Sequence, residues 1–165
     1  MKSTKLISGT KFSIFYILSC AVVCLTGGCD NANGNLQPLI INPTLIGKGD
    51  LYGNGAENIP KQNVIVTNQN DWTALIHAMN TVNNVSDSFT EINIDFNSFQ
   101  IVTVFDNVKP NGGHSIDITD VTVTESNITV TVQNLLTGGL NSVITQPFHI
   151  VKIPKSPKQI VFIAG

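Results

Sequence analysis

Apolar and polar residues alternate over much of the second half of this chain, the pattern of β-strands with one buried face. The alternation is strictest at 128–132, where isoleucine and valine are separated by threonine. The run 101–105 is more continuously apolar and is typical of a central strand, and 64–66 is a shorter buried run. The pattern predicts a mainly antiparallel β-sheet of about six or seven strands.

One segment has helical instead of alternating periodicity. Asn68 or Asn70 can cap its start, and Asp71 lies in the first turn, where the helix dipole favours a negative charge. Two asparagines at 83–84 end it. The apolar face consists of Trp72, Leu75, Ile76, Met79 and Val82. The chain is therefore expected to be an α+β protein with one amphipathic helix near the start of its domain.

Three places in the strand pattern are irregular. Ile118 and Val121 are both apolar but would lie on opposite faces of a regular strand, so we expect a bulge or break at 119–120. Pro147 falls inside an apolar run and indicates an edge or interrupted strand. The residues 92–94 are expected to begin a strand.

The N-terminus has the layout of an export signal. Three lysines precede an apolar run at 12–25, which is too short for a membrane span of about 20 residues. The small residues before Cys29 resemble a bacterial lipobox, in which the cysteine is lipidated and becomes the first residue after cleavage. Thr26 stands where leucine is usual. The alternative is a plain signal peptide cut near Gly28 that leaves Cys29 free.

These features divide the chain into three parts. Residues 1–28 are expected to be the lipoprotein signal peptide, and 29–60 the lipidated cysteine with an Asn/Gly-rich tether. The aliphatic residues within 39–46 would be costly to leave in water, so part of the tether is expected to pack on the domain. Residues 61–165 form that domain.

Composition narrows the classes of function. All three cysteines lie at or before position 29, so the domain has no disulfide. Without the leader, six lysines, no arginine and eleven acidic residues remain, which disfavours a nucleic-acid partner. The same charge disfavours electrostatic docking on anionic lipid. Membrane attachment is therefore expected to come from acyl chains such as palmitate on Cys29.

Four stretches from about Gly47 onward resemble the protease-complex subunit PrcB family. They are the glycine-rich lead-in 47–55, the strand and tryptophan-bearing helix at 64–75, the Asp-Phe pair and valine-rich strand leading into the Gly-Gly turn at 94–114, and the closing segment 146–154. The resemblance covers most of the chain after the leader. The sequence departs from the family at His114, where tyrosine is usual, so no ring-stacking role is carried over to that position.

The resemblance implies a lipoprotein of the cell envelope that binds and stabilises a surface or periplasmic protease and is not itself an enzyme. A protease-inhibitor-like or adhesion module is the alternative among binding proteins. From another class, the alternative is a secreted hydrolase that uses His114 or His149. No nucleophile turn of the Gly-x-Ser-x-Gly type and no zinc-ligand spacing occurs in the sequence, so we expect no catalytic, metal-binding or cofactor-binding residues.

The loop 109–114 is the candidate partner-binding segment. Pro110 fixes one backbone dihedral, and the two glycines permit positive φ or a close backbone approach. A rigid exposed turn would present polar side chains to a partner, whereas the simpler interpretation is a turn between two strands. The candidate residues are Lys109, Asn111, Gly112, Gly113 and His114.

Overall fold

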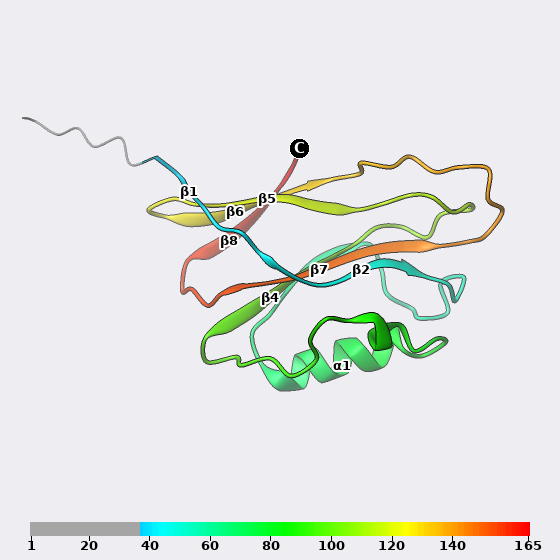
Figure 1. Cartoon of the computed structure of the whole chain (residues 1–165), viewed down its shortest axis with the longest axis horizontal. Helices are drawn as coiled ribbons and strands as arrows, with labels where there is room; N and C mark the ends of the chain where they lie inside the picture. The colour runs from blue at the N-terminus through cyan, green and yellow to red at the C-terminus, as the bar shows by residue number, and fades with distance from the viewer. Residues whose placement is uncertain (1–36) are drawn as a thin grey trace, which may run out of the picture. The chain divides into compact units, whose positions relative to one another are not determined.

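The computed structural model describes residues 37–165, in which two four-stranded sheets and one α-helix form three layers (Figure 1). Helix α1 (Gln69–Met79) covers one face of the central sheet, whose strand order is β2-β7-β4-β3. The other face packs on an outer sheet of order β1-β5-β6-β8. The strands are β1 (Leu39–Ile40), β2 (Thr44–Leu51), β3 (Gln62–Val66), β4 (Phe99–Phe105), β5 (Asp117–Val123), β6 (Asn127–Gln133), β7 (Gln146–Pro154) and β8 (Gln159–Ala164).

Strand β4 is apolar on both faces because both of its faces are covered. Ile101 and Phe105 belong to the hydrophobic cluster beneath the helix, whereas Val102 and Val104 belong to the cluster between the two sheets. All four side chains are fully buried. The expectation of a central strand at 101–105 is confirmed.

Helix α1 begins where the sequence indicates. The Asn68 side chain caps it by accepting the Asp71 backbone N–H at 3.0 Å. Trp72 is fully buried, stacks on Phe89 and donates its ring N–H to a backbone carbonyl at 2.8 Å. Inclusion of Val82 in the apolar face was wrong, because the helix ends at Met79 and Val82 is 46% exposed.

The bulge expected at 119–120 is present. The pairing of β5 with β6 shifts register between Ile118 and Asp120. The shift returns Val121 to the face that carries Ile118, and both side chains are buried in the cluster between the sheets.

Pro147 does not lie at a sheet edge, which corrects the prediction. It is the second residue of β7, which is paired on both sides, with β2 and with β4. Proline lacks the N–H that would bond the Asp106 carbonyl. The Gln146 side-chain amide donates to that carbonyl instead, at 2.9 Å.

Other differences concern the number and limits of the strands. The described residues form eight strands instead of six or seven, and β6 and β8 pair in parallel while the other pairs are antiparallel. No strand begins at 92–94, because Asp95 forms a turn by accepting hydrogen bonds from Asn97 and Ser98. The described part of segment 29–60 contributes β1 and β2 to the two sheets.

Candidate functional site

An ion pair joins β2 to the outer sheet. Lys48 of β2 bridges Asp117 at the start of β5. The Ser115 hydroxyl donates to Asp117 at 2.5 Å, and the Leu135 backbone N–H donates to it at 3.3 Å. Burial opposes ionisation of this carboxyl, but the bonds from Lys48 and Ser115 outweigh it and hold the Asp117 pKa below its ordinary value. Asp117 is therefore a buried anion that holds β2 against the start of β5.

His149 of β7 lies beside this ion pair and is almost fully buried. Its Nδ1 accepts the Ile118 backbone N–H at 2.9 Å, so the neutral ring carries its proton on Nε2. Burial, and next the positive charge of Lys48, lower the His149 pKa to about 4, although Asp117 acts in the opposite direction. His149 is therefore neutral at pH 7 and links the two sheets as an acceptor.

The candidate loop 109–114 pairs along its length with the β6–β7 loop (134–145). Lys109 exchanges two backbone hydrogen bonds with Thr145, at 2.7 and 3.1 Å. The Gly112 carbonyl accepts a backbone N–H of the β6–β7 loop at 2.9 Å. The two loops therefore form a hydrogen-bonded extension beyond the sheets.

The polar side chains of the candidate loop bond within the protein. The Asn111 amide donates to the Gly139 carbonyl at 2.7 Å, and its Oδ1 lies 3.0 Å from Nε2 of His114. The Lys109 ammonium lies 2.8 Å from a carboxylate oxygen of the buried Asp106. The first of these contacts joins the two loops, and the other two hold the candidate loop in its own conformation. That Asn111 and His114 also contact a partner stays a prediction.

The two glycines of the loop differ in conformation. Gly113 has φ of +81°, where side chains other than that of glycine are strained, and an added Cβ would lie 3.2 Å from the Gly139 backbone nitrogen. Gly112 is buried without a positive φ. Gly113 therefore sets the turn, and Gly112 fits beneath the opposite loop.

The β6–β7 loop carries a series of exposed aliphatic side chains. Leu140 is fully exposed, and Leu135 and Leu136 are each 58% exposed. We call the exposed set the aliphatic loop: Leu135, Leu136, Leu140, Val143 and Ile144.

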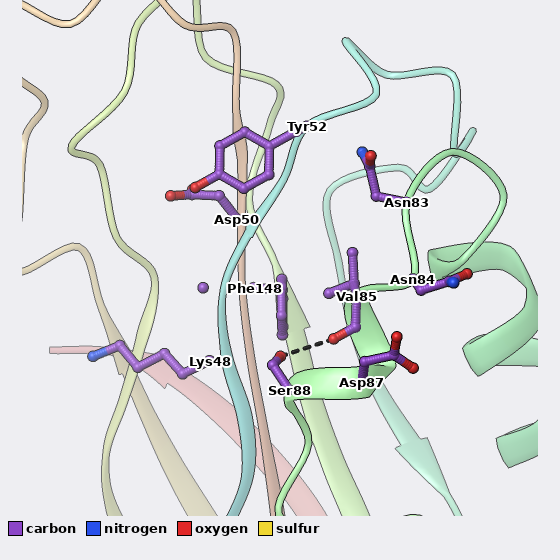
Figure 2. A pocket seen from close by; sticks show the side chains of 10 residues that line it. Lys48, Asp50, Tyr52, Asn83, Asn84, Val85, Asp87, Ser88 and Phe148 are labelled. Carbon is purple, nitrogen blue, oxygen red and sulfur yellow. Dashed lines mark hydrogen bonds between the residues drawn. The ribbon is translucent and has the colours of Figure 1, made fainter.

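A groove of about 610 Å³ lies between β2 and the segment 83–88, which contains the 3₁₀-helix η1 (Val85–Ser88). Figure 2 shows the Phe148 ring between β2 and Val85, with Asp87 beyond it. The Lys48 side chain points away from these residues. The groove therefore has an apolar floor and a polar rim.

A second hollow, of about 290 Å³, shares Lys48, Gly49, Asp50 and Phe148 with the groove. It is completed by His114, Ser115, Ile116 and Leu136, which come from the segment before β5 and from the aliphatic loop. The residues Lys48 to Asp50 of β2 are thus common to both concave regions.

Asp50 is a partly buried acid at this shared position. Its Oδ1 is buried and has no hydrogen-bond partner among the described residues. Burial raises the Asp50 pKa, while Thr145 and His114 act in the opposite direction. The Asp50 carboxylate therefore has capacity to accept a further hydrogen bond.

The second hollow brings His114 and Ser115 together, which is one requirement of the hydrolase alternative. A catalytic pair would need the serine hydroxyl to donate to an imidazole nitrogen. The Ser115 hydroxyl instead donates to Asp117 and accepts the Leu136 backbone N–H at 3.0 Å. The Nε2 atom of His114 lies against Asn111. This arrangement does not favour a serine nucleophile.

Cys29, the expected lipid-attachment residue, lies outside the described residues. Within 37–165, no helix is long and apolar enough to cross a membrane. The same range contains no group of three or more histidine, cysteine or acidic side chains placed to hold a metal ion.

Sequence reasoning missed the contribution of β2 to the site. The Gly-Lys-Gly-Asp sequence between Ile46 and Leu51 was assigned to a glycine-rich lead-in. In the structure, Gly47 and Gly49 lie where a Cβ would meet the rings of Phe89 and Phe148. The alternation of glycine with charged residues at 47–50, flanked by the aliphatic Ile46 and Leu51, was the signal that could have identified this strand.

Comparisons of this chain with protein-family models, with curated proteins and with solved structures find no match.

Proposed function

We propose that this chain is a non-catalytic lipoprotein of the bacterial cell envelope, anchored through Cys29, whose β-rich domain binds a protein partner. The observation that carries the proposal is the aliphatic loop, which exposes five apolar side chains on one hydrogen-bonded loop pair. Grouped exposed apolar residues mark interaction sites more often than scattered ones do.

The rigidity of this loop pair supports a binding role. The exchanged bonds between Lys109 and Thr145, and those made by the Asn111 side chain, hold the loop without a covering layer of protein. A preformed loop loses less conformational entropy when it binds. The candidate loop 109–114 thus acts as the scaffold, and the aliphatic loop forms the contact surface.

The kind of partner is proposed from the sequence resemblance. A PrcB-like domain implies a surface or periplasmic protease that the lipoprotein stabilises. The acidic balance of the chain after its leader agrees with a protein partner and not with nucleic acid.

Affinity purification from the native envelope tests this proposal. The tagged wild type should recover a protein partner, and the double substitution Leu135→Asn with Leu140→Asn should recover at least tenfold less. Leu39→Asn is the matched control, because Leu39 is also exposed (68%) but lies on β1. Equal recovery by all three proteins would exclude the aliphatic loop, and no partner with the wild type would refute the proposed function.

A further inference from the structure

Among residues 37–165, strand β2 is an outermost strand of the central sheet, so one of its edges has no neighbouring strand in this part of the chain. Thr90 covers only its first part, by donating its N–H to the Ile46 carbonyl at 2.8 Å and its hydroxyl to the Leu45 carbonyl at 2.6 Å. A strand edge of this kind presents backbone N–H and C=O groups that another chain can pair with.

The outward-pointing groups of β2 follow from the position of Pro147. The Pro147 carbonyl accepts the Asp106 N–H, so the backbone of residue 147 points toward β4 and not toward β2. Backbone groups alternate between the two sides along a strand. Pro147 lies opposite Asp50, and His149, two residues later on the same strand, lies opposite Lys48. The N–H and C=O groups of Lys48 and Asp50 therefore point to the free edge.

This free edge has a concave region on each face of the sheet. The 610 Å³ groove lies on the helix side, where Gly49 leaves room above the buried Phe148 ring. The 290 Å³ hollow lies on the side of the outer sheet, where Lys48 reaches Asp117. Side chains of an added strand would alternate between the two faces, so each concave region would receive every second residue.

The charge at the edge favours a basic segment. Lys48 is paired with Asp117, so its charge is already compensated. Asp50 retains a buried oxygen without a donor, and Asp87 lines the groove with no lysine bonded to it among the described residues. A lysine or arginine side chain would donate to the Asp50 carboxylate.

We propose that β2 binds an extended segment of a protein partner as an added strand. The segment pairs with the backbone of Lys48 and Asp50, places apolar side chains in the groove between Gly49 and Val85, and places a lysine or arginine beside Asp50. The inference rests on the proposed function, since it assigns a binding mode and a chemical class to part of the partner.

Binding of a defined peptide to the full chain, purified in detergent, tests the inference. The probe is a fluorescent eight-residue peptide of alternating valine and lysine, and its control has glutamate in place of lysine. The lysine peptide should bind at least tenfold more tightly, and the backbone amides of Lys48 and Asp50 should become protected from hydrogen exchange. Equal binding of the two peptides, no binding of either, or protection elsewhere would overturn the inference.

Two substitutions at one position separate the backbone contribution from the charge. Asp50→Ala removes the carboxylate and keeps the N–H, and should weaken binding of the lysine peptide about tenfold. Asp50→Pro also removes the outward N–H, which an edge strand tolerates, and should weaken binding at least threefold more. Equal affinity of the two variants would exclude strand addition. Should the proline variant fail to fold, the exchange protection in the wild type decides.

The failure of this inference is distinguishable from failure of the proposed function. Recovery of an envelope partner by the wild type and by Asp50→Pro alike would overturn strand addition at β2 and leave partner binding intact. A dimer of this chain that Asp50→Pro dissociates, with no binding of the lysine peptide, would also overturn the inference and make a second copy the occupant of the edge.

Discussion

Acidification from pH 7 to pH 5 should destabilise this domain through His149. The side chain is buried as the neutral imidazole, and its pKa of about 4 lies below the ordinary value of 6.5. An unfolded chain therefore binds a proton at this residue at a pH where the folded chain does not. Stability from this site is complete above pH 6.5 and is lost as the pH falls toward 4.

The magnitude follows from these two values. The difference in proton binding between pH 7 and pH 5 corresponds to about 2 kcal/mol of unfolding free energy. The paired carboxyls contribute mainly at lower pH, because Asp106 and Asp117 have pKa values below their ordinary 3.8. Asp50, whose pKa is raised by burial, acts in the opposite direction. Its contribution is common to the wild type and to a His149 variant, so the difference between these two proteins reports on the imidazole.

Urea unfolding followed by tryptophan fluorescence at several pH values measures the effect. His149→Asn is the control, since the asparagine oxygen can accept the Ile118 N–H in place of Nδ1 but does not titrate. The variant should be less stable at pH 7 and nearly independent of pH between 7 and 5. A wild-type loss well under 1 kcal/mol, or the same loss in the variant, would refute the assignment of His149 as a buried neutral acceptor.

Three further predictions concern the helix, the loop and the anchor. Trp72→Ala should lower the free energy of unfolding in urea melts by about 3–5 kcal/mol, because it empties a fully buried site and removes an aromatic stack. His77→Ala, on the exposed side of the helix, should leave the urea midpoint nearly unchanged. Gly113→Val should lower the free energy of unfolding by about 2 kcal/mol, because Gly113 has a positive φ, and Gly112→Ala should lower it clearly less. Equal losses would contradict the assignment of Gly113 as the residue that sets the turn. Labelling of cells with a palmitate analogue should tag the wild type and not Cys29→Ser, and equal labelling would exclude this residue as the anchor.

Local patterns predicted the elements that depend on local physics. The helix start follows from Asn68 and the spacing of Trp72 and Met79, and the bulge follows from the change of face between Ile118 and Val121. In each case the residues that carry the signal lie within about ten positions of one another. Their periodicity is determined by the geometry of a single helix or strand.

Pairings between distant segments were not predictable in this way. β2 was assigned to a tether because Gly47 and Gly49 are typical of loops, yet its register is determined by β7, about a hundred residues later. Pro147 indicated an edge because the substitute donor, the Gln146 amide, is recognisable only once the Asp106 carbonyl is in place. The same long-range pairing places Asp50 at the edge of the central sheet. The candidate site could therefore be assembled only from the three-dimensional structure.

The position of β7 in the central sheet has a consequence for biosynthesis. This strand lies between β2 and β4, but it follows β2 in the chain by about a hundred residues. While the ribosome is still making the preceding segment, β2 has no strand to pair with and the sheet cannot close. Pairing over such a separation is also slow once the chain is complete. For a chain that we propose to be exported, late closure would keep the nascent polypeptide loose enough to pass through a translocation pore before it folds.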